Sequence, residues 1–408
     1  MSLTITNSPA YRSFVGNPVR FSLLTDSEQP LSCALTIAGQ VVYTFSHVPF
    51  QGVCQFDIAD ILTAYIDTPI LESSQTDIVT PIRQGYTVYY TLTVTTGVES
   101  ETVTFNGIGF RGGISKRLMR ELQSKGLDMF SYRLSNPQRQ FFFTTRTNGR
   151  NIRIRENELT PLLFLAPVEN MTLVTDSGRL IAITGLSTQT LYALNIPAVR
   201  KTVFDTYGEL PTYFSLLIAD HYVCDITLMP TTPAIEHNIL LFRNSLGTYE
   251  CIAFDAASTR TFESADKDQN KYTLFDSQTS GYITGYFRLP VTPVRKTETS
   301  IRPPSELMFL TDLLSSDDVY LLVPGKSAIP VHVTGDKLQL PGISTEPVSV
   351  SVTIRAVESD AYYSPEADYR QPSNRFGEWI FEDGTLNSWG IMYNNRRLIE
   401  NNNSQNSQ

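Results

Sequence analysis

Apolar and polar residues alternate along much of this chain, and this pattern predicts β-strands. Clear examples lie at 19–23, 32–37, 86–94 and 348–354, where every second side chain is apolar. A period of two places one face of a strand in a core and the other toward solvent. In 86–96, YTVYYTLTVTT, nearly every residue is β-branched or aromatic, as strands favour. The pattern predicts a mostly β fold.

Residues 238–254, NILLFRNSLGTYECIAF, predict a β-hairpin. Two apolar runs flank the polar stretch from Asn244 to Gly247. Glycine adopts positive φ without steric penalty, which suits a tight connection between strands. We therefore expect a short loop at this point.

Capping signals predict a few short helices. The caps are Asp57 ahead of 58–66, Ser115 ahead of 116–125, and Ser305 ahead of 306–314. Asp and Ser side chains at such positions accept hydrogen bonds from the first helical N–H groups. Gly126 follows the second segment and predicts its end.

Turn signals divide the sequence into tandem β-sandwich-like modules. We predict a first module at 1–105 with a crossover helix, a second at 106–235, a third at 236–358, and an extended arm with a polar tail at 359–408. The glycine-rich stretch GIGFRGGI (107–114) is interpreted as a joint or a turn between modules. A length of 408 residues agrees with roughly two to four domains.

Composition favours a protein that contacts other proteins. Charged residues make up 18% of the chain, below the ~25% of typical domains, so the surface must rely on Thr, Ser, Asn, Gln and Tyr. The net charge is −9, whereas a general nucleic-acid binder carries a positive field against the phosphates. Nucleic acid is therefore not expected as the primary partner.

The pattern of the first residues and the lengths of the apolar runs bear on targeting and membrane insertion. Its first residues lack a basic stretch followed by an apolar one, and no apolar run reaches the ~20 residues of a membrane span. We expect synthesis in the cytoplasm without a signal peptide and no membrane span. The four cysteines lie singly among strand-like residues and are expected to be buried, while the pairings Cys33–Cys54 and Cys224–Cys251 stay open.

No constellation of catalytic, cofactor-binding or metal-ligating residues is recognisable. The four histidines (His47, His221, His237 and His332) stand at no metal-ligand spacing, and no nucleophile motif GxSxG occurs. The stretch 107–113 is not followed by a Walker lysine. We expect a non-enzymatic protein that holds neither cofactor nor metal.

A basic stretch is the first candidate interface. Three aromatic residues, Phe141, Phe142 and Phe143, are followed in the sequence by four arginines. These are Arg146, Arg150, Arg153 and Arg155. Arginine interleaved with aromatic residues can bind single-stranded nucleic acid. In an acidic chain, the negative surface of a partner protein is favoured over nucleic acid. A solvated strand face remains the simplest alternative.

The segment 361–400 is the second candidate interface. It contains both tryptophans and many tyrosines at irregular spacing, which burial along one strand or helix does not explain. We predict a partner-binding arm, although a pair of strands covering the third module fits nearly as well. Its candidate contact residues are Tyr362, Tyr363, Tyr369, Trp379, Trp389 and Tyr393.

Three segments resemble virion structural proteins of tailed bacteriophages and prophages of Bacteroidetes-type bacteria. These are ILLFRNSLGTYECIAF (239–254), ELMFLTDLLSSDDVYLLV (306–323) and VSVSVTIRAV (348–357), within a resemblance that covers about 106–360. The resemblance implies a tail, neck or baseplate component, built of β-sandwich modules and present in a symmetric assembly. It implies no catalytic residue.

The main hypothesis is therefore a structural component of a bacteriophage particle, located in the virion and acting as a homo-oligomer that contacts other virion proteins. The alternative is a carbohydrate- or receptor-binding module on a particle or cell surface, with a host glycan or receptor as partner. A polysaccharide-degrading enzyme would need two carboxylates facing each other across a sugar, and no sequence pattern identifies such a pair.

Overall fold

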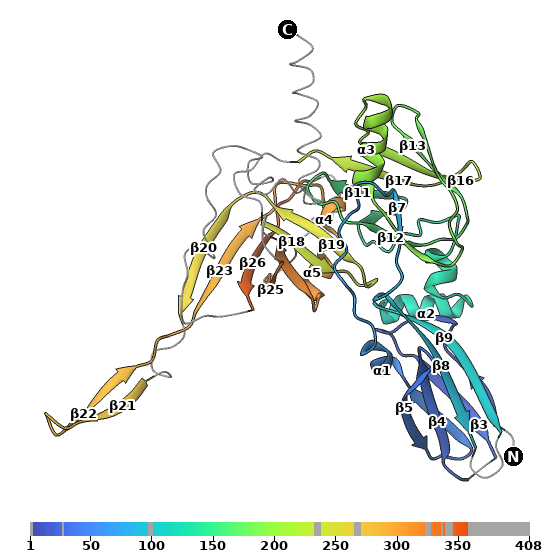
Figure 1. Ribbon diagram of the computed structural model, residues 1–408, viewed down its shortest axis with the longest axis horizontal. Coiled ribbons are helices and arrows are strands. Elements are labelled where there is room, and N and C mark those ends of the chain that lie inside the picture. Colours follow the sequence, from blue (N-terminus) through green and yellow to red (C-terminus); the bar gives the residue numbers. More distant parts are fainter. Residues whose placement is uncertain are drawn as a thin grey trace, which may run out of the picture. The chain divides into compact units, whose positions relative to one another are not determined.

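The computed structural model describes residues 3–26, 28–96, 101–231, 238–264, 271–322, 328–335, 338 and 346–357 (Figure 1). These residues form several β-sheets and a few short helices, which confirms the predicted mostly β class. The chain divides into two compact units. Unit 1 holds Met1–Ile152, Thr160–Thr227 and Asn244–Tyr249, and unit 2 holds Arg153–Leu159, Leu228–Arg243 and the chain from Glu250 onward.

Unit 1 begins with a β-sandwich. One sheet has the order β1-β3-β6, and the other has the order β2-β9-β8-β4-β5. The first sheet consists of β1 (Leu3–Asn7), β3 (Arg20–Thr25) and β6 (Val53–Asp57). The second consists of β2 (Arg12–Phe14), β4 (Leu31–Ile37), β5 (Gln40–His47), β8 (Thr87–Thr95) and β9 (Thr102–Phe110).

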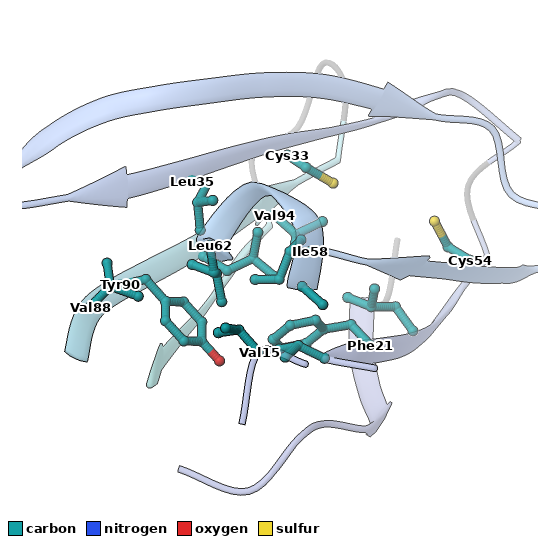
Figure 2. Packing of buried hydrophobic residues seen from close by; sticks show 14 of the residues in the cluster. Val15, Phe21, Cys33, Leu35, Cys54, Ile58, Leu62, Val88, Tyr90 and Val94 are labelled. Carbon is teal, nitrogen blue, oxygen red and sulfur yellow. The ribbon is translucent and has the colours of Figure 1, made fainter. Parts of the chain in front are cut away.

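The core of the sandwich follows from the alternation in the sequence. Phe21 of β3 packs with Val88, Tyr90 and Val94 of β8, and Leu62 reaches the same core (Figure 2). A fully buried side chain of this kind stabilises the fold by about 1.5–3 kcal/mol relative to exposure. The sandwich therefore holds together chiefly by apolar contacts between its two sheets.

All four cysteines are free thiols. All four are also buried, as the sequence predicted. Cys33 and Cys54 come from different sheets of the sandwich and share its core (Figure 2). Burial raises the pKa of Cys33 to about 12, with a smaller contribution from nearby Cys54, and burial raises the pKa of Cys54 to about 11. These thiols are protonated at neutral pH.

The rest of unit 1 is a mixed α and β region. A six-stranded sheet has the order β10-β11-β17-β16-β13-β14, and a three-stranded sheet has the order β12-β15-β7. The strands of the larger sheet are β10 (Thr147–Asn148), β11 (Asn151–Arg155), β13 (Met171–Thr175), β14 (Leu180–Ile183), β16 (Tyr213–Ile218) and β17 (His221–Met229). Those of the smaller are β7 (Val79–Pro81), β12 (Leu162–Leu165) and β15 (Leu191–Leu194).

One predicted cap is confirmed and a second is confirmed only in part. Ile58 is the N-cap of α1 (Ala59–Thr63), which is shorter than predicted, while Asp57 Oδ1 one residue earlier accepts a hydrogen bond from Ala59 N–H at 3.0 Å. Ser115 Oγ accepts from Leu118 N–H at 3.2 Å and caps α2 (Lys116–Ser124), after which Gly126 has φ +67°. The short π-helix η1 (Phe130–Leu134) and helix α3 (Ile196–Tyr207) were not predicted.

The interpretation of residues 107–114 as a joint or turn was wrong for 107–110, whereas 111–114 do connect β9 to α2. Residues 107–110 belong to β9 and pair with β8, for example Gly109 with Val88. A Cβ added at Gly107 would meet the ring of Tyr90. The glycines therefore allow close packing inside unit 1 and do not form a free loop or a phosphate cradle.

Unit 2 is built on a seven-stranded sheet of order β19-β18-β24-β25-β26-β23-β20. The adjacent strands β18 and β19 confirm the hairpin predicted at 238–254, and Gly247 in its loop has φ +85°. The strands are β18 (Asn238–Arg243), β19 (Tyr249–Phe254), β20 (Ser258–Ser264), β23 (Val291–Glu298), β24 (Val319–Leu322), β25 (Ile329–Thr334) and β26 (Ser351–Ala356). A separate pair consists of β21 (Lys271–Asp276) and β22 (Gly281–Tyr286).

Helices α4 (Pro304–Leu307) and α5 (Leu310–Ser315) pack into the core of unit 2 through Leu307, Leu310 and Leu313. The prediction that Ser305 caps one continuous helix was wrong. The first helix begins at Pro304, after Pro303, so that Ser305 lies inside it. Proline is well suited to this first helical position because its missing N–H has no helical partner there.

An ion pair inside unit 2 is almost fully buried. Arg302 Nη1 donates to Glu158 Oε1 at 2.6 Å, and Arg302 Nη2 donates to the Ala253 carbonyl at 2.7 Å. Burial alone would lower the pKa of Arg302, but Glu158, Asp255 and other nearby carboxylates raise it above its ordinary value. Removing one partner of such a pair typically costs about 3–5 kcal/mol, so this contact fixes the segment 153–159 within the unit.

The predicted module boundaries can be placed on these elements. The division at 105/106 falls inside β9, and the division at 235/236 falls between β17 and β18. The arm at 359–408 lies outside the described residues. No helix within the described ranges is long and apolar enough to cross a membrane.

Candidate interaction surface

Strands β20 to β23 of unit 2 form two nested antiparallel pairs, which we call the ribbon (258–298). β20 pairs with β23 from Ser258↔Thr297 to Ser264↔Val291. Between them in sequence, β21 pairs with β22 from Lys271↔Tyr286 to Asp276↔Gly281. Figure 1 shows β21 and β22 paired with each other.

A four-residue turn closes the inner pair. Asp276 Oδ1 accepts from Gln278 N–H at 3.0 Å, and Asp276 Oδ2 accepts from the Thr279 hydroxyl at 2.6 Å. Both bonds lower the pKa of Asp276, and the bond from the Thr279 hydroxyl has the larger effect. A side chain that bonds its own turn in this way favours the reversal and fixes the register of the two strands.

Several strand edges of the ribbon have no pairing partner among the described residues. β23 pairs with β26 only from Val294 to Glu298, so Val291–Pro293 pair on one side alone. β20 is the last strand of its sheet, and β21 and β22 pair only with each other. Free edges present rows of N–H and C=O groups that another strand can pair with.

Both faces of the inner pair carry exposed apolar side chains. The register places Phe275 opposite Tyr282 on one face and Leu274 opposite Ile283 on the other. The Phe275 and Tyr282 ring centroids lie 5.4 Å apart, and those of Tyr272 and Phe287 lie 4.7 Å apart. The exposed fractions are 59% for Leu274, 60% for Phe275, 77% for Tyr282, 54% for Ile283, 55% for Tyr286 and 59% for Phe287.

The inner pair has no net charge. Between residues 271 and 287, Lys271 and Asp276 are the only charged side chains, and they cancel. The whole chain carries a net charge of −9.

The inner pair is also expected to need a partner for its stability. An isolated two-stranded hairpin is only marginally stable in water, and large exposed apolar surfaces usually mark interaction sites. The arrangement can therefore gain stability by pairing its edges and covering its faces with another β-structure.

The four arginines of the predicted basic patch do not share one surface. Arg146 and Arg155 are buried, and Arg155 Nη2 lies 3.5 Å from Glu306 Oε2. Arg153 is half-buried and its Nη1 donates to Ser305 Oγ at 3.5 Å. Arg150 is exposed, with its guanidinium 5.6 Å from the centroid of the Tyr222 ring.

The six aromatic candidates of the predicted arm, Tyr362, Tyr363, Tyr369, Trp379, Trp389 and Tyr393, lie outside the described residues. The sequence analysis missed the ribbon, although a signal existed. The stretch KYTLFDSQTSGYITGYF (271–287) has two β-rich runs around a polar turn, with apolar residues in both phases of the alternation. When apolar residues occupy both alternating sets of positions in a strand, both of its faces carry apolar side chains and neither face is purely polar.

No protein-family model matches the chain, and no curated protein is significantly similar to it. Among the described residues, no group of three or more His, Cys, Asp or Glu side chains is arranged to hold a metal ion.

Proposed function

We propose that this protein is a non-enzymatic structural component of a bacteriophage particle, in the tail or its connection to the capsid. It acts by assembling with copies of itself and by contacting other virion proteins. The observation that carries the proposal is the ribbon, whose inner pair exposes apolar side chains on both faces and whose outer edges have no pairing partner among the described residues. The resemblance of 239–254, 306–323 and 348–357 to virion proteins supports the setting.

A second copy of this chain is the partner that suits the inner pair best. The N–H and C=O groups of a free edge are satisfied by another strand, and each copy supplies such strands. A chain with net charge −9 repels its own copies, and the neutral inner pair adds no like-charge contact to that repulsion. A partner selected by charge would instead require a charged contact surface on the inner pair, where Lys271 and Asp276 are the only charged side chains.

The test is the mass of the purified full-length protein in solution, measured by light scattering over a range of concentrations. We expect a defined oligomer. Replacing Phe275→Ser together with Tyr282→Ser removes the main apolar pair of one face and should yield monomers at the same concentration. Tyr89→Ser, at a tyrosine 63% exposed on β8, is the control and should leave the oligomer intact.

Circular dichroism must show that the double variant keeps its β-structure. A wild-type protein that stays monomeric at the highest concentration and is missing from purified phage particles would refute the proposal. An oligomer that the double variant leaves intact would refute the role of the ribbon.

A further inference from the structure

Strands β16 and β17 of unit 1 carry a cluster of hydroxyl groups around one carboxylate. Asp225 Oδ1 accepts from the Tyr213 hydroxyl at 2.6 Å and from the Ser215 hydroxyl at 2.8 Å. Asp225 Oδ2 accepts from the Tyr222 hydroxyl at 2.9 Å. Ser215 Oγ also lies 2.9 Å from the Tyr213 hydroxyl, so the four side chains form one connected network.

A β-bulge brings Tyr222 into this cluster. Ser215 and Asp225 are direct cross-strand partners, and the register shifts between Leu216 and Leu217. Tyr222 and Asp225 are three residues apart, so a regular strand would point them to opposite faces. The extra residue leaves Val223 and Cys224 both buried and turns Tyr222 to the face of Asp225. Bulges commonly re-aim a side chain in this way beside functional sites.

The rim of the cluster is open and polar. Tyr222 is 41% exposed, and the exposed Arg150 guanidinium lies 5.6 Å from its ring centroid. Arg150 donates no side-chain hydrogen bond to, and forms no ion pair with, another described residue. Asp225 has about four lone-pair positions, of which the three hydroxyl groups occupy three. One acceptor position and the Arg150 donors therefore remain for a ligand.

We infer that this face of β16 and β17 binds a neutral pyranose unit of a glycan. The Tyr222 ring offers an apolar surface to the C–H face of the sugar, Asp225 accepts from a sugar hydroxyl, and Arg150 donates to a sugar oxygen. A tyrosine with an apolar body and a polar end suits such an amphipathic ligand. Burial and the bond to Asp225 raise the pKa of Tyr222, so its hydroxyl stays a donor at neutral pH.

Charge selects among sugars at this site. The Asp225 carboxylate lies at the centre of the cluster and repels an acidic sugar, whereas the single positive charge of Arg150 stands at the rim. Repulsion of the wrong ligand contributes to specificity as much as attraction of the right one. The inference concerns unit 1 and goes beyond the proposed assembly role, so that either stands without the other.

The experiment uses the full-length protein on an array of immobilised neutral oligosaccharides of glucose, galactose, mannose and N-acetylhexosamines, beside matched uronic-acid oligosaccharides. We expect binding to a subset of the neutral sugars and none to the acidic ones. Tyr222→Ala should weaken that binding at least about tenfold, a loss of about 1.4 kcal/mol. Tyr222→Phe keeps the ring and should retain most of it.

Asp225→Asn removes the repulsion and should narrow the preference for neutral over acidic sugars. Tyr89→Ala, at an exposed tyrosine outside the cluster, is the control and should leave binding unchanged. Saturation-transfer NMR with the best sugar should show contact to tyrosine ring protons, lost in Tyr222→Ala. Absence of binding to every neutral sugar, or binding that Tyr222→Ala leaves unchanged in a folded protein, would overturn the inference.

Discussion

At the scale of single residues, the buried thiols of the sandwich predict a loss of stability at alkaline pH. The pKa of Cys33 is about 12 and that of Cys54 about 11 in the folded chain, against an ordinary 9.0. Between these values the unfolded chain releases thiol protons that the folded chain retains, so stability is full below pH 9 and falls as pH rises toward 12. The urea midpoint of unfolding, followed by circular dichroism, should decline across this window.

Cys33→Ala serves as the control for this prediction. The variant removes one buried thiol, so its midpoint should be lower at neutral pH because of the cavity but should fall less steeply above pH 9. Equal slopes in the two proteins would mean that the thiol does not contribute to the alkaline loss.

For the arginines, the sequence predicts the local secondary structure but not the distant residues that they contact. The alternation of Arg153 and Arg155 correctly indicated a strand, β11. It gave no indication that Arg155 pairs with Glu306 or that Arg153 contacts Ser305, because those partners are far away in the chain. A buried arginine needs a carboxylate beside it, and local pattern cannot show whether the fold supplies one.

At the scale of elements, we predict that adding one methyl group at Gly247 strongly destabilises the fold. It has φ +85° in the loop between β18 and β19, and an added Cβ would collide with the carbonyl group of Arg111, within unit 1. Gly247→Ala adds this clash to the backbone strain of positive φ. We expect a loss of at least about 2 kcal/mol in the free energy of unfolding, measured by urea denaturation.

Gly149→Ala is the matched control for the clash. Gly149 has a similar φ of +73°, but an added Cβ there would meet nothing within 4 Å. Its substitution should therefore cost only the backbone strain, about 1–2 kcal/mol. If the two variants were equally stable, the close approach of Gly247 to Arg111 would carry no energetic weight.

Local signals predicted elements well where the element depends on its own residues. The cap of Ser115 and the hairpin at 238–254 were found because their hydrogen bonds and turn residues are adjacent in sequence. Helix α3 was missed, although Pro197 near its start and Gly208 at its end mark it. The glycines at 107 and 109 misled because their reason is tertiary: they admit the side chains of Tyr90 and Val88.

At the scale of the whole molecule, the two candidate surfaces differ in how far the sequence could predict them. The inner pair of the ribbon has a local signal, two β-rich runs around the Asp276 turn, but its exposure depends on which surfaces the rest of the fold leaves uncovered. The cluster around Asp225 depends on one bulge. Alternation alone would have placed Tyr222 on the buried face. The two surfaces lie in different units, so the proposed assembly and the proposed ligand site use different residues.

Self-assembly through the ribbon predicts that thermal stability depends on protein concentration. A partner that binds only the folded chain stabilises it by mass action, by about 2.7 kcal/mol at a hundredfold excess over Kd. For units of this size, each kcal/mol added to the free energy of unfolding raises Tm by about 2–4 °C. Differential scanning calorimetry of the full-length protein should therefore show a Tm that rises by several degrees over a hundredfold range of concentration. The Phe275→Ser, Tyr282→Ser variant should show a Tm independent of concentration, whereas Tyr89→Ser should behave like the parent chain. A parent Tm that stays constant over the whole range would mean that the folded chain does not associate with itself, and the exposed apolar faces of β21 and β22 would then require a different protein as their partner.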